Sequence, residues 1–407
     1  MRYLIFLSTC LLLLSAAWFP YGMTKFTDGK TKPDWGFFAH RRINRLAVFT
    51  LPPEMMVFYK PNIDWISDHA VDPDMRRYAT KNEAPRHYID LDVWGQPPFD
   101  DLPRNWLDAM LQHTDLFGVS THGDTVMLLE GMQALPPDLH PNYRRFFTTH
   151  LLPQLYRDEN ALPADSLRPL LETGAILTPF ETVFFRENLS EHGILPWHLQ
   201  KMQRDLTEAM RTRNSKRILR LSAELGHYIG DAHVPLHTTS NYNGQKTEQH
   251  GIHGFWESRI PELFADEQYD YLVGKASYID NTSEFYWNTV LASNAMVDSV
   301  LDIEWALRVS FPPDRQTCPE TRGGRVLLAP CRDYAAAYQN ALQGMVERRM
   351  RSAISALGHA WYTAWVDAGQ PDMSNLDAPV VTQEDLKEEV EVKKKFDLGK
   401  ILGRPEE

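Results

Sequence analysis

Residues 201–229, KMQRDLTEAMRTRNSKRILRLSAELGHYI, carry the clearest helical pattern in the chain. Apolar side chains, among them Met210, Ile218, Leu221 and Leu225, recur there at helical spacings, and their neighbours have good helix propensity. The pattern therefore predicts helix along most of this segment.

Residues 333–366 form a second long helical stretch, whereas the alternation typical of strands is scarce everywhere. Pro-rich joints at 52–53, 97–98, 136–137 and 312–313 indicate breaks between helices. The composition, with 43% hydrophobic residues, is ordinary for a globular protein. We therefore expect an all-α fold with little trace of sheet.

The N-terminus has the pattern of an export signal. In residues 1–17, MRYLIFLSTCLLLLSAA, one basic residue precedes an apolar run that ends on small side chains. The run is short for a membrane span, which needs about 20 residues. We expect a signal peptide cleaved near Trp18 and a secreted or periplasmic protein; an uncleaved anchor is the alternative. Lipidation at Cys10 is disfavoured because the apolar run continues beyond it.

Charge and cysteine content narrow the possible partners. The formal net charge of −12 argues against a basic face that grips duplex nucleic acid. It does not exclude an anionic substrate, because bound metal ions can supply local positive charge. Apart from Cys10, the only cysteines are Cys318 and Cys331, which flank a Gly-rich turn. Export would permit a disulfide between them, but sequence spacing leaves a free pair equally open.

Residues 225–257, LGHYIGDAHVPLHTTSNYNGQKTEQHGIHGFWE, contain five of the 15 histidines. Two His-x-x-x-acid pairs occur here, and a spacing of four places both members on one helix face, where they can meet one ion. Imidazole with carboxylate is a ligand set that suits zinc when thiolates are absent. The pairs are His227 with Asp231 and His253 with Glu257, and His237 follows Pro235 between them.

A second group of candidate residues lies upstream. Asp72, His87 and Asp90 occur in the segment DHAVDPDMRRYATKNEAPRHYIDLD, and Trp35 and His40 precede it in WGFFAH. Taken singly, these residues are ordinary.

Taken in order, both groups resemble the superfamily of zinc-dependent bacterial phospholipase C and the fungal single-strand-specific nucleases. Its motif is an N-terminal Trp and a His, an Asp, His-aromatic-x-Asp, His-x-x-x-Asp with Pro-x-His, and His-x-x-x-Asp/Glu. The chain fills these slots with Trp35, His40, Asp72, His87 to Asp90, His227, Asp231, His237, His253 and Glu257.

The resemblance implies an all-α bundle around a cleft that holds two or three zinc ions. Asp72, His87, His227 and Asp231 would hold one ion, and Asp231 would bridge to a second. His237, His253 and Glu257 would hold another, and Trp35 with His40 would complete the ion that Asp231 bridges. A zinc-bridged hydroxide would attack the phosphorus of a diester. Asp231 and Asp90 are the expected catalytic residues, Asp90 by orienting a ligand or the phosphate.

The resemblance also divides the chain. After the signal peptide we expect a leader at 18–34, the hydrolase domain at 35–376 and a charged, disordered tail at 377–407. The stretch between His87 and His227 is long for the fold, so residues 105–190 are expected to be a helical insertion. In the family the Trp is the mature N-terminus, whereas Trp35 would require a second cleavage before it.

The substrate remains open between several classes. A phosphodiester in single-stranded nucleic acid or a nucleotide is slightly favoured by the short spacing from Trp35 to His40. A phospholipase C acting on phospholipid head groups is the alternative, favoured by Glu257. A non-catalytic, metal-stabilised binding protein is a weaker reading. A di-iron protein is disfavoured because that class uses Glu-x-x-His pairs.

Overall fold

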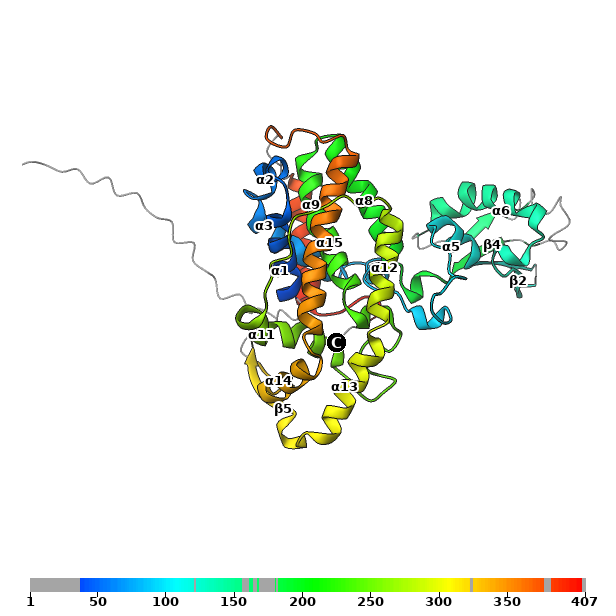
Figure 1. The fold of residues 1–407 in the computed structure, drawn as a ribbon. Helices are drawn as coiled ribbons and strands as arrows, with labels where there is room; N and C mark the ends of the chain where they lie inside the picture. Colours follow the sequence, from blue (N-terminus) through cyan, green and yellow to red (C-terminus); the bar gives the residue numbers. More distant parts are fainter. Residues whose placement is uncertain are drawn as a thin grey trace, which may run out of the picture.

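The computed structural model describes residues 37–120, 122–155, 161–163, 167, 180, 182–322, 325–376 and 382–404. The predicted signal peptide, the leader and Trp35 lie outside the described residues. Within them the protein is mainly helical, and the helices form an elongated bundle with a smaller lobe to one side (Figure 1). The prediction of a mostly helical protein is confirmed, although small sheets are also present.

Five helices form the centre of the bundle and pack pairwise against one another (Figure 1). They are α1 (Phe37–Ala47), α8 (Leu195–Arg211), α9 (Ser215–Ala232), α12 (Thr282–Asn294) and α15 (Met345–Asp367). The other α-helices in the described residues are α2 (Pro53–Tyr59), α3 (Ile63–Asp68), α4 (Asp72–Arg76), α5 (Trp106–Gln112), α6 (His140–Phe146), α10 (Ile252–Gly254), α11 (Ile260–Gln268), α13 (Val297–Ser310), α14 (Arg332–Ala341) and α16 (Gln383–Leu398).

Helix α9 lies at the middle of the core, as the burial of every residue in its second half shows. Its neighbours bind its backbone as well as its side chains. The Asn44 amide donates to the carbonyl oxygen of Ala223 at 2.9 Å, and the Trp361 indole N–H donates to that of Ser222 at 3.2 Å. Buried polar groups need such partners, so these bonds fix how α1 and α15 lie against α9.

The two helical stretches predicted from sequence are each divided by a turn. Residues 201–229 form α8 and α9, which are separated at 212–214, and the Asn214 side chain caps α9 by accepting from the Arg217 N–H. Residues 333–366 form α14 and α15, and Gly344 between them has a φ of 75°. Such a left-handed conformation favours glycine and ends a continuous helix.

The 105–190 insertion is not the helical segment that we expected. Its described residues form α5, α6 and a four-stranded antiparallel sheet in the order β2-β1-β4-β3. The strands are β1 (Thr114–Val119), β2 (Thr125–Leu129), β3 (Ala161–Pro163) and β4 (Thr182–Glu187).

The two central strands, β1 and β4, show why a sheet forms here. Phe117 pairs with Phe184 across them, with ring centroids 5.1 Å apart, while Leu116, Val183 and Phe185 are buried. Aromatic and β-branched residues favour strands, and pairing across neighbouring strands stabilises them. The prediction of a helical insertion did not take this pairing into account.

The prediction of a disordered tail was also wrong for the described residues 382–404. They contain α16, which begins with a capping box at Thr382 and Asp385 and packs against α4. The charges that suggested a solvated segment instead include ion pairs with the bundle, such as Lys216 with Asp385. A charge run read alone cannot show that a partner surface exists.

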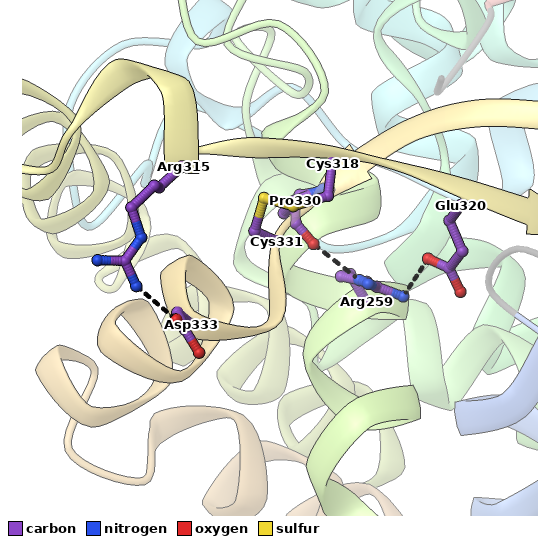
Figure 2. The surroundings of a disulfide bond; sticks show 7 residues. All are labelled: Arg259, Arg315, Cys318, Glu320, Pro330, Cys331 and Asp333. Atoms are coloured by element: carbon purple, nitrogen blue, oxygen red, sulfur yellow. Dashed lines mark hydrogen bonds and ion pairs between the residues drawn. A yellow bond between two sulfur atoms is a disulfide. The ribbon is translucent and has the colours of Figure 1, made fainter.

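The two cysteines near the C-terminal part of the domain are joined. Cys318 and Cys331 form a disulfide across the hairpin of β5 (Thr317–Arg322) and β6 (Arg325–Pro330), as Figure 2 shows. The same hairpin binds Arg259, whose guanidinium lies 2.7 Å from Glu320 and donates to the carbonyl oxygen of Pro330 at 3.1 Å (Figure 2).

Among the described residues, none of the helices has the length and apolar character needed to cross a membrane.

We expect loss of the disulfide to destabilise the domain. Changing Cys318 and Cys331 together to Ser removes a constraint on the unfolded chain, and the free energy of unfolding should fall by about 2–4 kcal/mol. Urea unfolding followed by circular dichroism measures the change. Arg315→Ala, which removes an exposed ion pair with Asp333 beside the disulfide, is the control and should change stability by less than about 1 kcal/mol. An unchanged midpoint for the double variant would contradict the expectation.

Candidate metal centre

Eight acidic and imidazole side chains from several elements meet at the end of α9. They form four overlapping groups of three, and within each group the ligand atoms all lie within 4.8 Å of one another. The groups are His87, His227 and Asp231; His237, His253 and Glu257; His40, Asp231 and Glu257; and His40, Asp74 and His227. Such groups could hold metal ions.

The first group forms around Asp231. Its Oδ2 lies 3.0 Å from Nδ1 of His87 and 3.3 Å from Nε2 of His227, and the two imidazole nitrogens are 3.0 Å apart. The helical spacing of four between His227 and Asp231 brings the two side chains together on one face of α9, as the sequence pattern predicts. His87 joins them from the end of the short 3₁₀ helix η3 (Ala84–Arg86).

The second group follows the break after α9. His237 belongs to the 3₁₀ helix η11 (Pro235–Thr238), and its Nε2 lies 3.3 Å from Oε2 of Glu257. His253 Nε2 lies 2.7 Å from the same oxygen. Glu257 belongs to a π-helical segment, η12 (Phe255–Arg259), whose last residue is bound by the disulfide hairpin. The hairpin therefore supports the segment that presents Glu257.

His40 of α1 connects the two groups. Its Nε2 lies 3.5 Å from Oδ1 of Asp231 and 3.3 Å from Oε1 of Glu257, and its ring stacks on His227 with centroids 4.0 Å apart. This close approach requires Gly230, since a Cβ there would come within 2.7 Å of Nδ1 of His40. The glycine of the sequence HYIGD therefore admits the imidazole from α1.

Backbone acceptors orient two of the histidines. Nδ1 of His227 donates to the carbonyl oxygen of Ala70 at 2.9 Å, and Nδ1 of His237 donates to that of His87 at 2.6 Å. Each bond places the proton on Nδ1 and leaves the Nε2 lone pair facing the carboxylates. Metal-binding histidines are held in this way.

The structure corrects the predicted ligand Asp72. The Asp72 carboxylate pairs with His69 at 2.8 Å and is partly exposed, whereas Asp74 Oδ1 lies 3.6 Å from Nε2 of His227 and 3.8 Å from Nδ1 of His87. Two residues apart on a helix correspond to about 200° of rotation, so the two carboxylates of the sequence DPD face opposite ways. Only Asp74 belongs to a candidate metal group.

A network of charges that the sequence analysis missed lies behind His87. Glu83 Oε1 is 3.7 Å from Nε2 of His87, and Glu83 also pairs with Arg76 and accepts from the Tyr228 hydroxyl. Arg76 in turn binds Glu224 at 2.7 Å. The spacing of four from Glu83 to His87 was the signal that could have identified this carboxylate, which orients the imidazole.

The local electrostatics favour binding of a cation. Burial lowers the pKa of His87, but hydrogen bonds to Asp231 and Glu83 and nearby negative charges raise it to about 9. Burial raises the pKa of Glu257, yet hydrogen bonds from His237, His253 and His40 hold it well below its usual range. Burial and the neighbouring His40 and His87 lower the pKa of His227 well below its usual value. The buried cluster thus keeps Glu257 ionised and His227 neutral, while His87 carries a proton that a bound cation would displace.

The donor atoms fit a metal ion chemically. Buried charge is costly unless it is paired or coordinated to metal, and imidazole nitrogens with carboxylate oxygens are ligands for divalent cations. These side chains are at most 20% exposed, and all except Asp74 are below 10%. The geometry therefore supports the prediction that the site can hold metal, while Trp35 lies outside the described residues.

Asp90, predicted as catalytic, lies outside the four groups. Its Oδ1 accepts from the Arg404 guanidinium at 2.6 Å, and the same guanidinium lies over the rings of Tyr88 and Tyr242, 3.9 and 3.6 Å from their centroids. We call Tyr88, Asp90 and Tyr242 the aromatic slot. Its backbone is joined to that of the metal groups, because Tyr88 follows His87 directly and the Ile89 N–H donates to the carbonyl oxygen of His237.

No family model matches the chain, and the comparison with curated proteins gives no match. The likeness to the phospholipase C and nuclease superfamily therefore rests on the order and spacing of the motif residues.

A matched pair of substitutions tests the corrected ligand. Asp74→Asn should weaken Zn²⁺ binding by at least about 100-fold, because an anionic donor next to His87 and His227 is lost. Asp72→Asn should change the affinity less than about threefold, since its carboxylate pairs only with a partly exposed His69. Competition with a fluorescent chelator measures both affinities. Equal losses in the two variants would contradict the assignment.

Zn²⁺ binding should also strengthen as the pH rises. The pKa of His87 is raised to about 9, so the metal-free protein keeps a proton there at neutral pH that a cation must displace. Between pH 6 and 8 the apparent affinity should rise about tenfold per pH unit for each proton released. Calorimetry in buffers of different ionisation enthalpy counts these protons. Binding without proton release would contradict this expectation.

Proposed function

We propose that this protein is a zinc-dependent hydrolase that cleaves phosphoric diesters, with nucleotides or single-stranded nucleic acid as the favoured substrates. The observation that carries the proposal is the meeting, in one buried cluster, of seven residues from the motif slots together with Asp74, which takes the place expected for Asp72; the seven are His40, His87, His227, Asp231, His237, His253 and Glu257.

The donor set favours zinc over other metals. Imidazoles and carboxylates make up the candidate groups, and the only described cysteines are joined in a disulfide. Zinc binds such sites readily, and catalytic zinc sites typically leave a position for water or substrate. A structural zinc site is commonly Cys-rich and closed, so the donor set is less typical of a non-catalytic, metal-stabilised protein.

Some residues of the chain would hold the metal, and others would recognise the substrate. Asp231, which contacts His40, His87 and His227, would be shared between two ions. Glu257 with His237 and His253 would hold another. Bound zinc would supply the Lewis-acid charge that stabilises negative charge developing on a phosphoryl group. The carbonyl oxygens that accept from His227 and His237 keep these imidazoles in the metal-binding tautomer.

The aromatic slot supports the preference for nucleotides. Tyr88 and Tyr242 offer ring faces beside the metal groups, and a planar guanidinium already contacts both. A nucleobase can stack on such faces, and the Asp90 carboxylate can accept a hydrogen bond from its edge. We therefore propose that Asp90 recognises substrate and does not act on phosphorus.

The same slot keeps phospholipase C as the second candidate. Aromatic rings beside a carboxylate also suit a quaternary ammonium group, such as that of choline, and the group now in the slot is a cation. Export, predicted from residues 1–17, forms part of the proposal for either substrate, and a disulfide suits an oxidising compartment.

The decisive experiment compares substrates on the zinc-loaded full chain. We expect release of mononucleotides from a single-stranded oligonucleotide, loss of activity with a chelator and recovery with Zn²⁺. Asp231→Asn should lower kcat/KM by about 10²–10⁴-fold, because the shared metal ligand is lost. Asp72→Asn is the matched control and should retain activity. Nucleotides are separated by chromatography after timed reactions.

Phosphatidylcholine vesicles provide the second arm of this experiment. Release of phosphocholine without cleavage of the oligonucleotide would replace the nuclease proposal with phospholipase C. Full zinc occupancy without cleavage of either substrate, or of bis-p-nitrophenyl phosphate, would contradict a phosphodiesterase.

A further inference from the structure

The C-terminal segment 382–404 returns to the metal centre through contacts that are distributed along its length. At its start, Asp385 pairs with Lys216, and Glu388 lies 3.6 Å from Arg220 of α9. These ion pairs are exposed or partly exposed, and no residue of α16 is buried. The helix is therefore docked onto the surface of the bundle and adds nothing to its core.

The end of α16 adds an aromatic contact. The Phe396 ring stacks against Phe37 with centroids 6.1 Å apart and meets Tyr78 edge-on at 4.9 Å. Phe37 begins α1, the helix that carries His40, and Tyr78 follows α4, the helix that carries Asp74. Phe396 therefore positions the following residues beside the cluster.

Backbone bonds then direct the chain into the aromatic slot. The Leu402 N–H donates to the carbonyl oxygen of Arg77 at 2.9 Å, and the Arg77 guanidinium donates to the carbonyl oxygen of Arg404 at 2.8 Å. This pair of reciprocal bonds fixes the backbone on both sides of Gly403, whose φ of 106° suits only glycine.

The Arg404 side chain fills the slot. Its guanidinium contacts Tyr88 and Tyr242, pairs with Asp90 at 2.6 Å and lies 3.4 Å from the carbonyl oxygen of Thr239, and the side chain is 12% exposed. Cation–π contacts and a charge-assisted hydrogen bond are among the stronger polar interactions at a partly buried site. Arg404 thus contacts both rings and the carboxylate that define the slot.

We propose that residues 382–404 are a self-inhibitory strap, in which Arg404 occupies the substrate-recognition slot and must leave before substrate binds. This inference rests on the proposed function, because it takes the slot to be where the base or head group of the substrate binds. The strap is an intramolecular competitor, and a tethered ligand has an effective concentration of about millimolar. Its weak ion pairs, which salt screens, allow it to leave.

The experiment removes the competing side chain from the zinc-loaded full chain. If the strap is docked about nine-tenths of the time, Arg404→Ala should lower KM for a dinucleoside monophosphate about tenfold with kcat unchanged. Arg404→Lys, which keeps the charge without the planar group, should have an intermediate effect. Phe396→Ala, which loosens the strap from outside the slot, should also lower KM.

Arg211→Ala is the matched control, since this exposed arginine of α8 pairs with Glu208 and the carbonyl oxygen of Asp367. It should leave KM unchanged. A second readout is independent of turnover: adenosine 5′-monophosphate should bind Arg404→Ala about tenfold more tightly than the wild-type protein. Binding to the wild-type protein should speed hydrogen exchange at the Leu402 amide, which the docked strap protects.

The outcomes separate the strap from the proposed function. Zinc-dependent cleavage with the same KM in the wild-type protein and Arg404→Ala would overturn the strap and leave the function intact. Absence of cleavage in both would count against the function, and the nucleotide-binding arm then decides the strap. Tighter binding with release of the Leu402 amide supports it; equal binding, no binding or continued protection overturns it.

Discussion

The structure depends on the burial of two carboxylates, Asp231 and Glu257, among imidazoles at the end of α9. Charged groups in a protein interior require partners, and the surrounding histidines provide them. A bound metal ion would be a further partner for the same carboxylates. The position of α9 in the middle of the core follows from the same constraint, because helices on every side are needed to bring His40, Asp74 and His87 to Asp231.

Elements far from one another in sequence support this cluster in different ways. Helix α1 approaches α9 closely because Gly230 leaves room for His40, and Asn44 fixes the same contact one turn further along. The disulfide hairpin binds Arg259 and thereby steadies the π-helical segment that carries Glu257. The sheet of the 105–190 lobe supplies no residue to the four candidate groups, so the candidate metal ligands come from outside this lobe.

The C-terminal segment shows how a charge run can have a specific role. Its acidic half meets basic residues on α9, its aromatic residue packs between α1 and α4, and its last described arginine lies in the aromatic slot. None of these contacts contributes to the core. A segment bound in this way can exchange with another ligand without unfolding the domain, because local stability at a surface is lower than in the interior.

The sequence by itself determined the helical class and most of the candidate site. The period of 3.6 places His227 with Asp231, and the spacing of four likewise paired His253 with Glu257, because such spacings are local. The resemblance in motif order, not spacing, pointed to His40 and His87. Only the tertiary structure decided between Asp72 and Asp74, since the choice depends on which face of a short helix meets α9. It likewise revealed the sheet and the docked tail, because strand pairing and surface docking join residues distant in sequence.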